Sequence, residues 1–103
     1  MPPPTARRAC FDAYVFDTLM PDLVGHDRSP AAFVVYLFLY RQRLRERLTK
    51  VRISHRNLAA ETGLSKSAVQ AAVRRLRARR LILSTRPSAT AVPEYEVLQP
   101  WRR

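Results

Sequence analysis

The sequence predicts a mainly α-helical domain with a small β-hairpin, an α+β fold. Three patterns carry this prediction: a long apolar helix after Ser29-Pro30, two shorter helices that meet at Gly63, and two alternating segments near the C-terminus. The chain has 103 residues, which is enough for one core and too few for a second independent domain. We therefore expect a single domain over residues 10–103, preceded by a disordered tail over residues 1–9.

The segment from Phe11 to Val24 carries mixed signals. Its apolar residues recur every four positions, as on a helix, at Phe11, Val15, Leu19 and Leu23. The run Tyr14-Val15-Phe16 is strand-like, however, and Pro21 interrupts a helix. We expect a short extended piece followed by a helical turn that Asp17 caps.

A long helix is expected from Pro30 to about Leu48, because Ser29 supplies a capping hydroxyl and proline suits the first helical position. Its apolar residues form one stripe, which we interpret as core: Phe33, Leu37, Tyr40, Leu44 and Leu48, widened by Val34 and Phe38. The four arginines between positions 41 and 47 point elsewhere.

Two shorter helices follow a short strand at 51–53. Ser54 caps a helix over 55–62 that ends at Gly63, and Ser65 caps a second helix from Lys66 to about Arg79. On the second helix the residues expected to face the core are Val69, Ala72, Val73 and Leu76. The opposite side carries Ser67, Gln70, Ala71 and Arg74. Residues 81–86 and 94–98 alternate as two strands, which the loop over 87–93 joins into a hairpin.

The two shorter helices resemble a helix-turn-helix. The residues that match its pattern of a small contact residue, a turn glycine and a branched apolar residue are Leu58-Ala59, Gly63-Leu64, Ser65, Val69 and Ala72. With a strand before it and a hairpin after it, the unit resembles a winged helix-turn-helix over residues 30–98, similar to regulators of the MarR and GntR types. The resemblance implies a helix-turn-helix at 54–80 and a wing at 81–98.

One position departs from those two types of regulator. They usually have glycine just before the hydrophobic pair that opens the hairpin, whereas this chain has Arg80 before Leu81-Ile82. Arginine enters a left-handed conformation reluctantly, so we expect a junction that is built differently.

The front of the chain resembles, over a shorter stretch, the opening of the helix-turn-helix domains of phage and plasmid replication initiators. The residues that carry this resemblance are Tyr14 to Leu23, together with Val35-Tyr36-Leu37 in the long helix. Replication initiation is therefore an alternative to regulation.

Basic residues are concentrated in one part of the chain. The whole chain has 19 Lys and Arg against 8 Asp and Glu, a net charge of +11. Residues 41–80 hold 13 of the bases and only Glu46 and Glu61, so this block accounts for the net charge. Such a block is typical of a surface that binds a polyanion, and the alternative is a set of solvated helix faces.

The winged-helix resemblance implies double-stranded DNA as the partner, with the second helix in the major groove. The side chains within reach of the bases are then Ser65, Lys66, Ser67, Gln70 and Arg74. Glutamine suits adenine, arginine or lysine suits guanine, and the serines suit either, while Ser65 also caps the helix. Contacts with the DNA backbone are expected from Arg52, Arg56, Arg75, Arg77, Arg86, Ser88 and Thr90.

The sequence offers little for catalysis, and we expect no enzyme, no cofactor and no metal. His26 and His55 have no second imidazole or cysteine at metal-ligand spacing, and Cys10 has no evident base beside it. The chain has two glycines and therefore no phosphate-cradling loop. Four aspartates recur every five residues, a period that fits one face of neither a helix nor a strand, and we interpret them as solvated or capping: Asp12, Asp17, Asp22 and Asp27.

The composition also predicts the compartment. One cysteine allows no internal disulfide, which fits a reducing cytosol. The longest apolar run, over 31–40, is about half of what a bilayer span requires, so we expect no membrane partner. The expected location is the cytoplasm, in association with the nucleoid.

Three function classes remain. The first is a bacterial or phage transcriptional regulator that occupies double-stranded DNA as a homodimer, without a small-molecule effector. The second is the DNA-binding part of a replication or partition system, and the third is a winged helix that serves as a protein or RNA adaptor. Dimer contacts are expected from the segment over 11–23, the long helix or the tail at Trp101, and Trp101 is either a lid on the core or an exposed contact.

Overall fold

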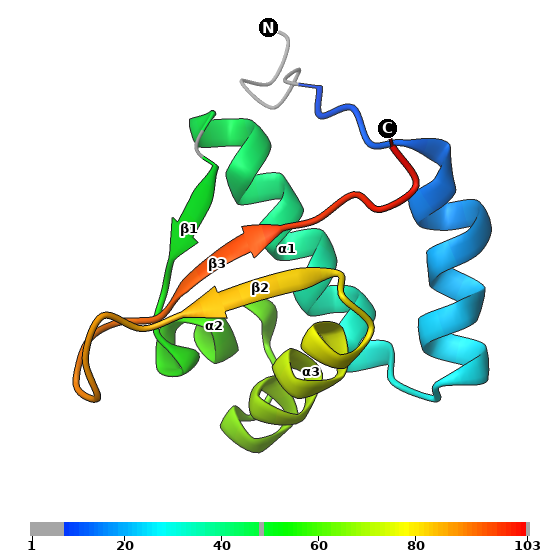
Figure 1. The fold of residues 1–103 in the computed structure, drawn as a ribbon. Helices are drawn as coiled ribbons and strands as arrows, with labels where there is room; N and C mark the ends of the chain where they lie inside the picture. Colours follow the sequence, from blue (N-terminus) through cyan, green and yellow to red (C-terminus); the bar gives the residue numbers. More distant parts are fainter. Residues whose placement is uncertain (1–7, 48, 103) are drawn as a thin grey trace, which may run out of the picture.

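The computed structural model describes residues 8–47 and 49–102 (Figure 1). After an N-terminal helical segment the elements are α1 (Pro30–Glu46), β1 (Lys50–Arg52), α2 (His55–Thr62), α3 (Lys66–Ala78), β2 (Ile82–Thr85) and β3 (Glu94–Val97). The predicted α+β fold with its hairpin is confirmed. Most of the expected tail over 1–9 lies outside the described residues. Within the described ranges no helix combines the length and the apolar character that a membrane crossing needs.

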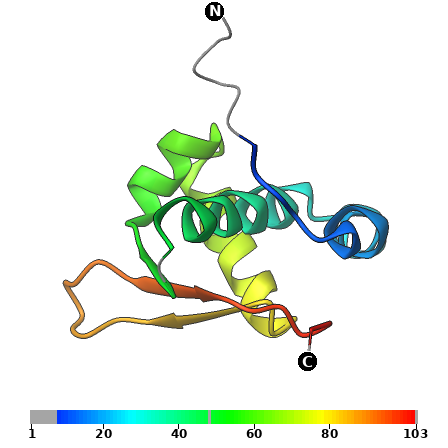
Figure 2. The same cartoon turned by 90° about the horizontal axis from the view of Figure 1, so that it is seen from above.

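The strands form one antiparallel sheet in the order β1-β3-β2. The predicted hairpin is the β2–β3 pair, in which Ser84 lies opposite Tyr95, and β1 pairs with the other side of β3, where Val51 lies opposite the same tyrosine. Helices α1, α2 and α3 lie on one side of this sheet (Figure 2). Tyr95 and Val97 are buried on that face, whereas Leu83 on the other face is exposed. The sheet therefore supports the helices from one side only.

The helix-turn-helix forms as the local signals predict. The Ser54 hydroxyl accepts a hydrogen bond from the Asn57 amide at 3.1 Å, and the Ser65 hydroxyl accepts one from Ala68 at 3.1 Å. Gly63 ends α2 in the left-handed region, with φ of 76°. The four residues predicted to face the core are all buried: Val69, Ala72, Val73 and Leu76. Burial of these four residues determines which side of α3 faces outward.

The junction between α3 and β2 corrects one expectation. Arg80 does adopt the left-handed conformation, with φ of 56°, in place of the glycine found in similar domains. The Leu81 amide donates to the Leu76 carbonyl at 2.9 Å and the Arg80 amide donates to the Arg77 carbonyl at 3.0 Å. These two bonds are the Schellman pattern that ends many helices. The chain therefore keeps the usual geometry, and burial of Leu81 and Leu76 offsets the cost of a left-handed arginine.

The N-terminal segment is helical, so the extended piece expected there is wrong. It contains two π-helical stretches, η2 (Val15–Leu19) and η3 (Pro21–His26), in which amides donate to the carbonyl five residues earlier. Pro21 stands at the first position of η3, between the two stretches, where its missing N–H is tolerated. The apolar spacing of four prevails over the strand-like run because Val15, Leu19 and Leu23 are all buried in the common core.

Three of the four aspartates that recur every five residues are bonded to other parts of the chain. Asp12 accepts hydrogen bonds from Trp101 and Arg102, and Asp22 and Asp27 both lie against Arg79. The interpretation that they are solvated or capping is therefore wrong for these three. Asp17 is exposed.

The long helix α1 ends at Glu46, and Arg47 follows it in the left-handed region. Leu48, the expected last residue, lies outside the described residues. The predicted stripe is partly wrong, because Val34 and Leu44 are exposed. The buried residues are Ala32, Phe33, Val35, Tyr36, Leu39 and Tyr40. They cover a wider arc than one stripe because η3, α3, α2 and the sheet all pack against this central helix.

Trp101 is a lid on the core. Its ring stacks on Tyr14 with centroids 4.7 Å apart, and its Nε1 donates to the Asp12 carboxylate at 2.8 Å. Close to it, the Tyr36 hydroxyl donates to the Leu98 carbonyl at 2.8 Å. The C-terminal residues therefore attach the N-terminal helix to α1.

Candidate nucleic-acid interface

A basic cleft runs between α3, the start of α2 and the β2–β3 hairpin. We use this name for a continuous depression whose polar lining includes His55, Arg56, Lys66, Gln70, Arg74, Arg77, Arg86 and Thr90. His55, Gln70 and Arg86 line both of its halves. No carboxylate is among the lining residues that the structure describes. The cleft therefore has the electrostatic character of an anion site.

The cleft brings together seven of the residues predicted to contact DNA. Lys66, Gln70 and Arg74 come from the set expected to read bases. The set expected to hold the backbone supplies Arg56, Arg77, Arg86 and Thr90. Lys66, Gln70 and Arg74 succeed one another along one side of α3, because they are four residues apart.

Two of the predicted base-reading residues lie at the tip of α3, outside the cleft lining. The hydroxyls of Ser65 and Ser67 are 3.2 Å apart, and Ser65 also caps the helix. Both side chains are exposed, so the cap does not bury them.

The remaining backbone candidates lie outside the lining of the cleft. The Arg52 guanidinium is 3.8 Å from Glu94 across the β1–β3 pair. Ser88 is exposed in the hairpin loop. Arg75 is exposed on α3. The hydrogen bond from His26 holds the pKa of Asp27 below its usual range, and the charges of Arg79 and Arg75 lower it further.

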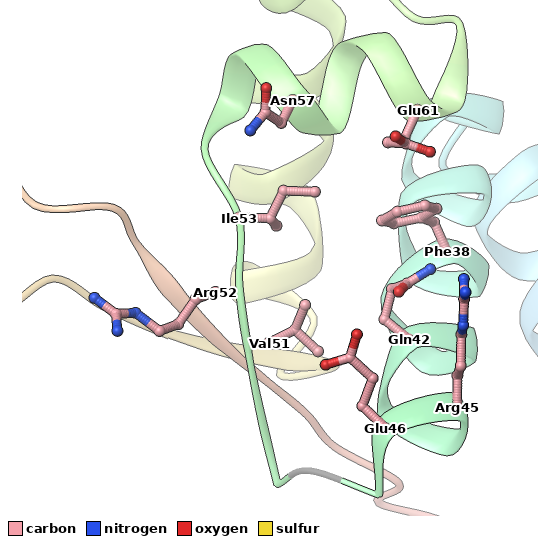
Figure 3. Close-up of a pocket in the computed structure, with 9 residues that line it drawn as sticks. All are labelled: Phe38, Gln42, Arg45, Glu46, Val51, Arg52, Ile53, Asn57 and Glu61. Atoms are coloured by element: carbon pink, nitrogen blue, oxygen red, sulfur yellow. The ribbon is translucent and has the colours of Figure 1, made fainter.

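A second groove lies between α1, β1 and α2 (Figure 3). Its apolar lining is formed by Phe38, Val51 and Ile53. Glu46 and Glu61, the two acids of the basic block, both line it, whereas Arg52 points away from the other labelled side chains. The carboxylates of the block are thus separated from the basic cleft.

The basic block over 41–80 does not form one surface. Arg79 is paired with Asp22 and Asp27, and Arg43 donates to Gln99 at 2.8 Å. Arg45 lines the groove of Figure 3. Some of the positive charge that the sequence assigns to a polyanion surface therefore serves the fold or lies elsewhere.

His55 is a residue of the cleft that sequence reasoning missed. It is the first residue of α2 and is half-buried. Burial lowers its pKa, and the charges of Arg86 and Lys66 lower it further. Its place between a capping serine and Arg56 is the signal in the sequence that points to this region.

Comparison with known families agrees with this geometry. Residues 44–82 match a family model described as winged helix-turn-helix DNA-binding. The chain contains a winged helix-turn-helix domain. The match runs from the last turn of α1 to the first residue of β2, and the β2–β3 hairpin of the structure supplies the wing. No curated protein and no solved structure matches the chain.

The family match supports double-stranded DNA as the ligand of this winged helix. In such domains the second helix of the motif enters the major groove. Here that helix is α3, whose exposed side forms one wall of the basic cleft. The wing forms the facing wall through Arg86 and Thr90.

Proposed function

We propose that the protein is a sequence-specific regulator that binds double-stranded DNA and acts by occupying its site. The observation that carries this proposal is the basic cleft between α3 and the wing, which has no described carboxylate in its lining. In this proposal α3 lies in the major groove and the wing follows the backbone or the minor groove. The protein works in the cytoplasm on the nucleoid, without catalysis, cofactor or effector.

Reading of the bases is assigned to the exposed side of α3. Arg74 and Lys66 suit the two acceptors of guanine, and Gln70 suits the paired donor and acceptor of adenine. The hydroxyls of Ser65 and Ser67 are free to rotate toward either kind of base edge. This assignment is supported by the exposure or partial exposure of all five side chains on one helix.

Backbone contacts are assigned to two groups of residues. The first lines the cleft: Arg56, Arg77, Arg86 and Thr90. The second lies outside that lining: Arg52, Arg75 and Ser88. The Arg52 side chain stays exposed beside Glu94, which supports exchange of that carboxylate for a phosphate.

A homodimer is part of the proposal. Large apolar side chains remain exposed along the N-terminal helix, among them Phe16 at 43% and Met20 at 41%. Exposed apolar patches of this kind are typical of association surfaces. Two copies related by a two-fold axis would read a symmetric site.

Selection from a random duplex library tests the proposal. Several rounds with the whole chain should enrich a motif whose two halves form an inverted repeat. Arg74→Ala should weaken the enrichment, whereas Arg45→Ala, which removes an arginine outside the basic cleft, should leave it unchanged. Failure to enrich any duplex would contradict sequence-specific binding.

The same selection tests the first alternative, and a binding measurement on RNA tests the second. Enrichment of iterated direct repeats would favour a replication or partition role. The segment from Tyr14 to Leu23 resembles replication initiators, which is the reason to consider this role. An affinity for RNA equal to that for duplex DNA, with an equally steep salt dependence, would favour the adaptor.

A further inference from the structure

His55 lies in the basic cleft, where protonation of its imidazole would change the affinity of the cleft for DNA. We propose that His55 contacts a DNA phosphate and takes up a proton as it does so, which makes DNA binding tighter at mildly acidic pH. This proposal rests on the proposed function, because it names a proton-linked contact at the same site.

The geometry places His55 among cations. It lines both halves of the cleft, together with Gln70 and Arg86. The charged groups that face it are Lys66, Arg74 and Arg77 from α3, Arg86 from the wing and Arg56 from its own helix. No carboxylate lines either half in the described residues, so no acid there stabilises a protonated imidazole.

In the free protein this environment keeps the ring neutral at pH 7. Burial is the main cause of the lowered pKa, and the charges of Arg86 and Lys66 add to it. A proton on His55 would add a positive charge to a half-buried site that already repels it.

A bound phosphate reverses this balance. Its negative charge compensates Arg86 and Lys66, and a protonated imidazole donates a charge-assisted hydrogen bond to a phosphate oxygen. The pKa of His55 is then higher in the complex than in the free protein. Because the protonated form binds more tightly, affinity rises as pH falls through the bound-state pKa toward the free-state pKa, and each unit between the two corresponds to about tenfold.

The other histidine supplies a matched control. The side chain of His26 is 79% exposed, and its ring lies 2.9 Å from the Asp27 carboxylate, outside the cleft. His26 is therefore a histidine outside the lining that holds the proposed phosphate contact.

The test is the affinity of the whole chain for one duplex between pH 8 and pH 5.5 at constant ionic strength. We expect the wild type to gain about 3- to 10-fold in affinity over this range. H26N should gain as much, and H55Q should show a flat profile. Calorimetry in buffers of different ionisation enthalpy should detect proton uptake by the wild type and not by H55Q.

A measurement on the unmodified protein guards against effects of substitution on folding. NMR titration of the His55 ring should give a higher pKa in the duplex complex than in the free protein. If the duplex binds tightly but its affinity does not change with pH and the pKa of His55 does not change on binding, the proton-linked contact is overturned and the proposed function stands. Absence of duplex binding at every pH would overturn both.

Discussion

Arg79, the residue that ends α3, is bound to Asp22 of the N-terminal helix, 57 positions earlier in the chain. The same guanidinium lies 3.6 Å from the Asp27 carboxylate, whose side chain is almost fully buried. A positive side chain at the end of a helix is also favoured by the helix dipole. The helix that is proposed to enter DNA is thus attached to the N-terminal helix through ion pairs.

Replacement of Arg79 tests this attachment. Arg79→Met keeps the length of the side chain and removes its charge, which leaves the buried Asp27 carboxylate without that cation. We expect a loss of about 1 to 3 kcal/mol in the free energy of unfolding, measured by urea denaturation. Arg74→Met, a neighbouring exposed change on α3, should cost less than about 0.5 kcal/mol. Equal losses in the two variants would show that the ion pairs do not stabilise the domain.

The packing of α3 predicts a severe effect of a charge at Val69. This residue is fully buried, so Val69→Asp should abolish cooperative unfolding, because burying an unpaired carboxylate costs on the order of several kcal/mol. Thermal denaturation followed by circular dichroism is the measurement. Ala71→Asp, on the exposed side of the same helix, should keep a cooperative transition. A normal transition in the Val69 variant would mean that the helix faces the other way.

Acid should release the C-terminal lid before it unfolds the domain. The hydrogen bond from Arg102 lowers the pKa of Asp12, and the one from Trp101 lowers it further. A lowered pKa in the folded state means that Asp12 stabilises the lid above the unfolded value of about 3.9, and this stabilisation is lost as pH falls through the folded value.

The only tryptophan of the chain reports on this step. The emission of Trp101 should shift to the red below about pH 4, ahead of the loss of helical signal. Asp12→Asn should remove this early transition, since an amide does not titrate there. An early transition that persists in the variant would assign the acid step to another group.

The helix-turn-helix could be predicted from the sequence because its signals are local. The caps at Ser54 and Ser65 and the left-handed Gly63 each act within a few residues, and the structure confirms all three. The N-terminal segment could not be predicted in the same way. Its π-helical turns depend on packing against α1 and on partners such as Arg79 and Trp101, which are distant in the sequence.

The candidate site also has a part that local sequence patterns predict and a part that depends on contacts between distant residues. Helix periodicity is enough to put Gln70 and Arg74 on the outer side of α3. It does not tell which arginine is bound by an aspartate, so Arg79 and Arg77 look alike in the sequence and differ in the structure. His55 joins the cleft because the hairpin loop lies beside the start of α2, a contact that no local pattern encodes.

Mutations should distinguish the residues that recognise bases from those that bind the DNA backbone. If Gln70 and Arg74 face base edges, each alanine variant should lose about 1 to 3 kcal/mol on the selected site and relax preference at one or two base positions. If Arg56 and Arg86 touch only the backbone, their alanine variants should weaken all duplexes alike. Each of these two should also make the salt dependence shallower by about one unit.

The comparison needs both the selected duplex and a scrambled one, because total affinity does not separate the two roles. If Arg74→Ala and Arg86→Ala both lower the affinity for the two duplexes equally and leave base preference intact, then α3 binds phosphates and does not recognise bases. The protein would then be an architectural binder without an operator.

The salt dependence of duplex binding tests the central claim most directly. If the basic cleft neutralises phosphates, the logarithm of the association constant for a non-specific duplex should fall linearly with the logarithm of salt concentration. The slope should correspond to about four to eight released counterions. A flat dependence between low and moderate salt would contradict DNA binding by this cleft.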